Sequence, residues 1–163
     1  MFESWALLLI LGAPLLGALG VAAFRNGTGG AARAITMTAM LIVLLAALRI
    51  FLTYDATTDA GRFALDVAWM PSLGIRFHVA VDGFAIYLLL VVAVLFPVAL
   101  AASWTTAASR RPLYLTLLLV LQTSLLGAFV AQNLVLFFVY WETVLIPMGI
   151  LILVFGGRER RAD

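Results

Sequence analysis

Cysteine and lysine are both absent from this sequence of 163 residues. Without cysteine, the chain has no disulfide, no thiolate metal ligand and no thiol nucleophile. All ten basic residues are arginine and the formal net charge is only +2, so the charge balance gives no indication of nucleic-acid binding. Charged residues make up 11% of the chain, against about 25% in a typical soluble domain. This shortage of charge excludes a globular domain with a water-exposed surface.

Hydrophobic residues make up 65% of the chain and gather in long runs. An apolar run of about twenty residues is long enough to cross a bilayer as a helix. We therefore predict an all-α, polytopic membrane protein with a single membrane domain over residues 1–163. Pro14 and Pro97 fall inside two of the runs and free the carbonyls of Ile10 and Ala93 from helical hydrogen bonding. The five predicted spans cover residues 5–24, 34–52, 84–104, 113–130 and 133–155.

Residues 54–82 form the one long polar connection, between the second and third spans. Apolar residues alternate with others from 63 to 69 and again from 75 to 81, on either side of a Pro-Ser-Leu-Gly turn at 71–74. Alternation around such a turn is typical of a β-hairpin, which we expect to lie on the membrane surface. Asp82 follows it and is predicted to cap the third span.

The arginines are unevenly distributed between the two sides of the predicted bundle. Seven fall on one side and three at or beyond the opposite ends of the spans, and the richer side is expected to be cytoplasmic. The amino terminus and the hairpin then face outward, and the carboxyl terminus faces the cytoplasm. The seven are Arg25, Arg33, Arg110, Arg111, Arg158, Arg160 and Arg161, and the three are Arg49, Arg62 and Arg76.

Glu142 is the strongest candidate for chemistry, because it is the single ionisable acid or base in the fifth span. A charged side chain at the bilayer centre costs about 2.5–3.5 kcal/mol on insertion scales, so a residue kept there usually has a function. We therefore expect Glu142 to face the bundle interior. Burial favours the neutral acid and a nearby cation favours the carboxylate, so such a group can exchange a proton. The alternative is a buried glutamate that only hydrogen-bonds a neighbouring helix.

Pro147 strengthens the case for Glu142. It has no N–H to donate to the carbonyl of Thr143, the residue next to Glu142. An unpaired carbonyl at membrane depth is tolerated only beside protein or water. The carboxyl, Thr143 and the freed carbonyl together predict a small hydrated pocket.

Gln122, Thr123 and Ser124 lie together near the centre of the fourth span. Such residues commonly form hydrogen bonds between membrane helices, and the alternative is that these three line a proton path.

No metal site is predicted, because His78 has no further ligand at a suitable spacing. The glycine-rich segment 25–30 is predicted to be a turn between two membrane helices. It lacks the strand-then-helix context of a phosphate-binding loop.

Residues 136–148, Leu-Phe-Phe-Val-Tyr-Trp-Glu-Thr-Val-Leu-Ile-Pro-Met, resemble the proton-channel helix of a known family. The family is chain M, the antiporter-like, proton-translocating membrane subunit of NADH:quinone oxidoreductase, or respiratory complex I. Residues 127–137, Gly-Ala-Phe-Val-Ala-Gln-Asn-Leu-Val-Leu-Phe, resemble the segment that leads into that helix, and Val-Asp-Gly-Phe at 81–84 resembles the start of the third helix. The resemblance covers essentially the whole chain, although the first two spans share only hydropathy and spacing with the family.

The resemblance implies that Glu142 pairs with a lysine on a later helix. Quinone reduction elsewhere in the complex would change this pairing and drive a proton across the membrane. This chain is then an enzyme subunit with no redox centre or cofactor of its own, and NADH, FMN, iron–sulfur clusters and quinone are expected in other subunits. Family members have many more spans, and their partner lysine lies on a helix after the fifth. This chain has five predicted spans and no lysine. The lysine-bearing helices are therefore expected from the missing part of a truncated chain or from a separate polypeptide.

The expected partners are other membrane subunits of complex I, including antiporter-like subunits, together with the lipid of a bacterial inner or cell membrane. Two alternatives remain. The chain is a subunit of a multi-subunit sodium/proton antiporter or a membrane-bound hydrogenase with the same fold, or it is a structural accessory subunit without transport.

Overall fold

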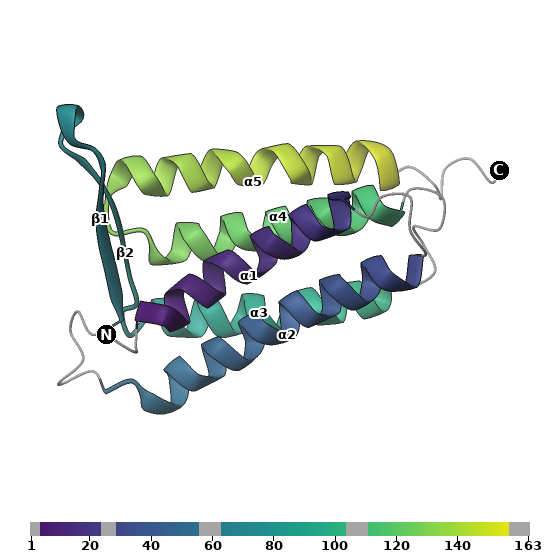
Figure 1. The fold of residues 1–163 in the computed structure, drawn as a ribbon, viewed down its shortest axis with the longest axis horizontal. Helices are drawn as coiled ribbons and strands as arrows, with labels where there is room; N and C mark the ends of the chain where they lie inside the picture. Colours follow the sequence, from purple (N-terminus) through teal and green to yellow (C-terminus); the bar gives the residue numbers. More distant parts are fainter. Residues whose placement is uncertain (1–3, 24–28, 56–62, 104–110, 157–163) are drawn as a thin grey trace.

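The computed structural model describes residues 4–23, 29–55, 63–103 and 111–156 (Figure 1). These residues form five helices that are long and apolar enough to cross a membrane, with a two-stranded hairpin between the second and third. The predicted all-α membrane fold with a hairpin at that position is confirmed. The elements are α1 (Ser4–Ala23), α2 (Gly29–Thr53), β1 (Ala64–Met70), the 3-10 turn η1 (Pro71–Leu73), β2 (Ile75–Ala80), α3 (Ala85–Ala102), α4 (Arg111–Val130) and α5 (Leu134–Phe155).

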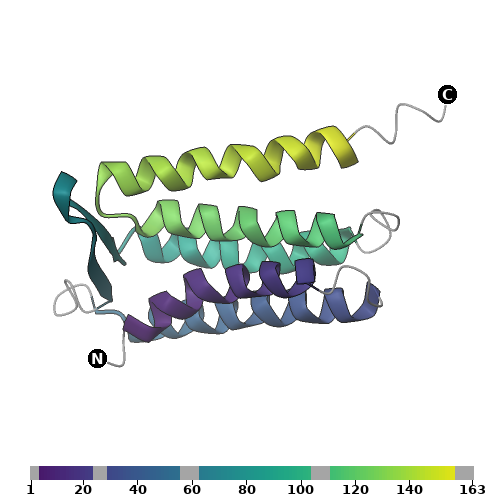
Figure 2. The ribbon, with the colours of Figure 1, turned by 45° about the horizontal axis from the view of Figure 1, so that its top comes forward.

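Helices α1 to α4 form a four-helix bundle, in which α1 and α3 each pack against both α2 and α4. Figure 2 shows α5 as a separate outer layer, and its packing contacts are with α4 and β2. In α4, 61% of the span is buried, whereas in α5 only 11% is buried. Helix α4 is therefore the central helix of the described residues, and α5 is peripheral.

The hairpin stands at one end of the bundle, and its turn projects past α5 (Figure 1). Leu65 pairs with Val79 and Val67 with Phe77, so these four side chains share one face of the hairpin. Gly74 closes the turn with φ of 68°, a left-handed conformation that glycine adopts without steric cost. The alternating apolar pattern in the sequence reflects this shared face.

The short connection between α4 and α5 is hydrogen-bonded to the hairpin. Ala131 forms an isolated bridge with Val79 of β2. The backbone N–H of Gln132 donates to the carbonyl of His78 at 2.9 Å, and its side-chain Nε2 donates to the carbonyl of Ala80 at 3.2 Å. The connection therefore continues the hairpin along the second edge of β2.

Carboxylate and amide side chains cap two of the membrane helices. Asp82 accepts hydrogen bonds through Oδ1 from the backbone N–H groups of Phe84 at 3.0 Å and Ala85 at 2.7 Å, which confirms its predicted role at the start of α3. Asn133 does the same for α5, where its Oδ1 accepts from the N–H of Leu136 at 2.8 Å. The starts of α3 and α5 both lie at the hairpin end of the bundle (Figure 1).

One helix boundary differs clearly from the sequence prediction. Helix α2 begins at Gly29, five residues before the predicted start at 34, so Gly29 and Gly30 belong to its first turn. Residues 25–28 of the predicted glycine-rich turn lie outside the described residues. The apolar run marks only the part of a helix inside hydrocarbon, whereas the hydrogen-bonded helix continues beyond it. The predicted ends at Phe24 and Trp104 lie outside the described residues.

The hairpin carries an exposed ion pair between its two strands. Nε of Arg76 donates to Oδ1 of Asp66 at 2.6 Å. This hydrogen bond, assisted by the positive charge of Arg76, holds the pKa of Asp66 below its ordinary value, and a smaller desolvation effect opposes it. Because both side chains are exposed, the pair contributes little to stability.

We predict that Arg76→Gln raises the pKa of Asp66 toward its ordinary value of 3.8. Because folding lowers the pKa of Asp66, the ion pair stabilises the hairpin at pH values above the ordinary pKa. This stabilisation is lost as the pH falls through the lowered pKa of the folded state. A carbon-13 NMR titration of the Asp66 carboxyl in the full chain measures the shift. The control is His78→Gln, which should change this pKa less because His78 has the smallest of the identified effects. Equal shifts in the two variants would argue against Arg76 as the cause.

Close packing between α4 and α5 gives a second prediction. The ring of Tyr140 occupies the space that a side chain at Gly127 would need. We predict that Gly127→Ala lowers the free energy of unfolding by about 1–3 kcal/mol, the usual cost of overpacking, although alanine is the better helix former. Unfolding in detergent, followed by tryptophan fluorescence, measures this change.

The matched control is Gly149→Ala on α5, because no atom lies within 4 Å of a side chain built there. It should be neutral or stabilising, and the double variant Gly127→Ala/Tyr140→Leu should recover most of the lost stability. Equal stability of the two alanine variants would contradict the packing explanation.

Candidate functional site

Glu142 is the only acidic residue within the five described helices, and it lies eight residues after the start of α5 at Leu134. At 1.5 Å per residue, this places it about 12 Å along the helix from the hairpin end. Its side chain is exposed. The prediction that Glu142 faces the bundle interior is therefore wrong for the five helices described.

The packing of α5 explains this exposure. Leu136 and Pro147 are buried and Tyr140 is half-buried on the face toward α4, where the Tyr140 ring contacts Gly127. At about 100° per residue, Glu142 is turned about 200° from Tyr140 and lies on the opposite face. A helix with neighbours on one side only presents its other side outward, whatever residues that side carries.

Thr143 and Pro147 do not share a face with Glu142. Thr143 is half-buried and its hydroxyl donates to the carbonyl of Val139, one turn earlier, at 2.7 Å. Pro147 is buried against the bundle. Among the described residues, Glu142 has no hydrogen bond or ion pair. The structure thus places the three predicted site residues on one helix but does not gather their side chains into a single pocket.

The outward face of α5 around Glu142 is apolar over its whole length. Its exposed surface includes aromatic rings, and those of Phe137 and Trp141 stack with centroids 5.8 Å apart. A soluble monomer rarely exposes such an area, and in this chain it faces lipid or another protein segment. A carboxyl on this surface can take up or release a proton and can pair with a cation. The large exposed residues of this face are Leu134, Val135, Phe138, Val139, Trp141, Leu145, Ile146, Ile152 and Leu153.

Gln122, Thr123 and Ser124 are buried in α4, as expected of polar residues inside a bundle. Their partners differ from the prediction of bonds between helices. Thr123 donates to the carbonyl of Leu119 at 3.0 Å and Ser124 to that of Val120 at 2.9 Å, both within α4. Gln122 is fully buried, and neither Oε1 nor Nε2 has a partner among the described residues. None of the three is joined to Glu142 by a hydrogen bond within the described part of the chain.

Asn133 is a positioning residue that the sequence analysis did not single out. Besides capping α5, it donates through Nδ2 to the carbonyl of Arg76 in β2 at 2.7 Å. This ties the start of the helix that carries Glu142 to the hairpin. An asparagine directly before a long apolar run is a recognised helix-start signal, and it would have predicted the cap. Nothing in the sequence pattern predicts the contact with Arg76.

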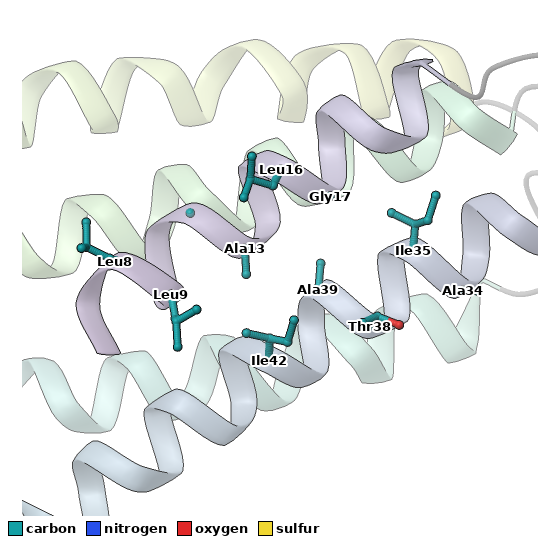
Figure 3. Close-up of a pocket in the computed structure, with 11 residues that line it drawn as sticks. Leu8, Leu9, Ala13, Leu16, Gly17, Ala34, Ile35, Thr38, Ala39 and Ile42 are labelled. Atoms are coloured by element: carbon teal, nitrogen blue, oxygen red, sulfur yellow. The ribbon is translucent and has the colours of Figure 1, made fainter. Parts of the chain in front are cut away.

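A groove of about 520 Å³ lies between α1 and α2, and Figure 3 shows the side chains that line it. Leucine and isoleucine side chains form its walls, and Gly12, Ala13 and Ala39 leave room between them. Thr38 supplies its only side-chain polar atom. Because it holds no ionisable group, the groove is not a site for proton chemistry. Among the described residues, no group of three histidine, cysteine or acidic side chains is placed to hold a metal.

Comparison with known proteins identifies relatives along most of the chain, although no family model matches it. It is 40% identical over 108 residues to an NAD(P)H-quinone oxidoreductase chain 4 from Nostoc sp., covering 66% of this chain and 20% of the relative. It is 32% identical over 151 residues to NADH-quinone oxidoreductase subunit M from Rhodobacter capsulatus, covering 90% of this chain and 29% of the relative. A third relative is F(420)H(2) dehydrogenase subunit M from Methanosarcina mazei, 32% identical over 110 residues, covering 68% of this chain and 22% of the relative.

The fold also matches a solved structure, respiratory complex I from Thermus thermophilus with bound NADH. The TM-score is 0.67 at 26% identity, and the match covers 93% of this chain and 30% of that chain. The chain thus spans less than a third of the proteins it matches. Together with the five apolar helices, these similarities show that it is an integral membrane protein of the family of antiporter-like membrane subunits of respiratory complex I, named subunit M or chain 4.

Proposed function

We propose that this chain forms the amino-terminal membrane part of a proton-translocating subunit of NADH:quinone oxidoreductase, with Glu142 as its proton-exchanging group. The observation that carries the proposal is the position of Glu142. It is the only acidic residue in the described helices, and it lies deep within the span of α5 on the face that the described residues leave uncovered.

The exposed position favours a partner that lies outside these residues. A charged carboxylate facing lipid costs about 2.5–3.5 kcal/mol, whereas a cation beside it favours the charged form. The sequence has no lysine, and the relatives are more than three times as long as the matched part. In this proposal, further helices that carry a lysine pack against the outward face of α5. The movement of that lysine toward or away from Glu142 changes which form of the carboxyl is stable.

The polypeptide provides proton chemistry and no electron transfer in this proposal. NADH, FMN, iron–sulfur clusters and quinone belong to other subunits, among them the membrane subunits with which this chain assembles. The name of the Methanosarcina mazei relative specifies F(420)H(2) as the electron donor, while that relative is also a subunit M. This is consistent with a membrane part that does not itself determine the donor.

The arginine distribution sets the proposed orientation. Helix ends with Arg33 and Arg111 lie at the end of the bundle away from the hairpin, and Arg76 lies in the hairpin itself. With seven arginines against three, we place the hairpin and the amino terminus outside and the carboxyl terminus in the cytoplasm.

We predict that Glu142→Gln lowers proton pumping about a hundredfold, because an amide cannot exchange a proton and proton-transfer groups contribute at least this much. Glu142→Asp should retain part of the activity. The measurement is acid uptake by vesicles that contain the assembled complex, divided by the rate of NADH oxidation. Glu159→Gln, the same change outside the apolar spans, is the control and should pump normally. Normal pumping by an assembled Glu142→Gln complex would exclude this assignment.

The absence of cysteine makes the orientation directly testable. We predict that Ser72→Cys, in the exposed hairpin turn, reacts with a membrane-impermeant maleimide added to intact cells. Ser109→Cys, between the third and fourth predicted spans, should react only after the cells are permeabilised. The reverse pattern would invert the proposed topology without affecting the assignment of Glu142.

A further inference from the structure

We propose that Gln122 is the anchor of a buried water-binding site between α4 and its neighbours α1 and α3. The starting observation is the isolation of its amide. Gln122 has 0% exposure, and both polar atoms of its side chain lack a hydrogen-bond partner among the described residues. Buried amides in native proteins are almost always paired with protein or with ordered water. Inside a membrane span the cost of an unpaired group is greater still.

Helix α4 itself offers no partner. Positions 115, 118, 119 and 126 share the face of Gln122 by helical spacing, and all four are buried leucines of the core cluster. Thr123 and Ser124 are adjacent, but their hydroxyls already donate to carbonyls of their own helix. Neither hydroxyl oxygen is a partner of Nε2, so we look for an acceptor on the neighbouring helices.

Two neighbouring helices supply carbonyls that lack their usual donor. Pro14 in α1 and Pro97 in α3 have no N–H, so the carbonyls of Ile10 and Ala93 receive no helical hydrogen bond. Both Ile10 and Ala93 have 0% exposure, so these carbonyls are as buried as Gln122. Helices α1 and α3 both pack against α4. An unpaired amide and two freed carbonyls thus occur on three helices that pack together around one apolar core.

These groups also lie at a similar depth. Ile10 is six residues from the hairpin end of α1 at Ser4, Ala93 is eight from that of α3 at Ala85, and Gln122 is eight from that of α4 at Val130. At 1.5 Å per residue, all three lie about 9–12 Å from the same end of the bundle. Such a level of polar groups in an otherwise apolar core is where an internal water is expected.

Water fits the chemistry of this level. One molecule can accept from Nε2 of Gln122 and donate to its Oε1 or to a freed carbonyl, and buried waters typically form about three such bonds. An apolar ligand would leave the amide unpaired. The proposal does not depend on Glu142, which lies on the outward face of α5, and it can stand or fall separately from the proposed function.

The test uses the two glutamines of the chain, Gln122 and Gln132. The full chain is labelled with nitrogen-15 at its glutamine side chains and reconstituted in lipid bilayers. Solid-state NMR then measures the transfer of magnetisation from water to each amide. Gln132, whose Nε2 donates to the carbonyl of Ala80 in the connection outside the helices, is the internal reference. We expect the Gln122 signal to build up from water on a timescale comparable to that of Gln132.

Gln122→Met, which keeps the length of the side chain and removes the amide, assigns the signal by its loss. A Gln122 amide that receives no magnetisation from water while Gln132 does would overturn the proposal, because it would show that a protein carbonyl satisfies the amide directly. Should Gln122→Met fail to fold, Gln132→Met assigns the two signals equally well. With either variant, the Gln122 signal is identified and its transfer of magnetisation from water can be measured.

Discussion

A helix in hydrocarbon must satisfy its own backbone hydrogen bonds, and every part of this structure is arranged around that requirement. In three of the helices an internal proline leaves one backbone carbonyl without its helical donor. These prolines are Pro14, Pro97 and Pro147. All three of these helices pack against α4, whose only proline, Pro112, lies in its first turn where no helical donor is lost. The three interrupted helices thus pack around α4, and α2, which has no proline either, packs against α1, α3 and α4. In α1 and α3 the residues whose carbonyls are freed, Ile10 and Ala93, are fully buried.

Features of the sequence that act over a few residues predicted the structure well. The apolar runs located five helices, the alternation on either side of the turn at 71–74 located the hairpin, and Asp82 caps α3 as expected. Each of these depends on local hydrogen bonding or on the periodicity of one element. The start of α2 was missed because hydropathy reports the thickness of the hydrocarbon, whereas the helix continues to Gly29.

The surroundings of the polar side chains were harder to predict, because they depend on which elements pack together. The depth of Glu142 in the predicted span marked it as unusual. The direction in which it faces, however, depends on tertiary packing, because α4 covers only one side of α5. Burial of Thr123 and Ser124 followed from their position, yet a short hydroxyl reaches the carbonyl one turn earlier before it reaches a neighbouring helix. The longer side chain of Gln122 does not form this bond to its own helix. Although it lies beside Thr123 and Ser124, its amide has no hydrogen-bond partner among the described residues.

The anchoring of α5 has a mechanical consequence. At one end Asn133 links it to β2, and in its middle the Tyr140 ring sits against Gly127 of α4. Contacts at two separate points along the helix oppose its sliding along α4. These two contacts therefore hold Glu142 at one height relative to the hairpin and to α4.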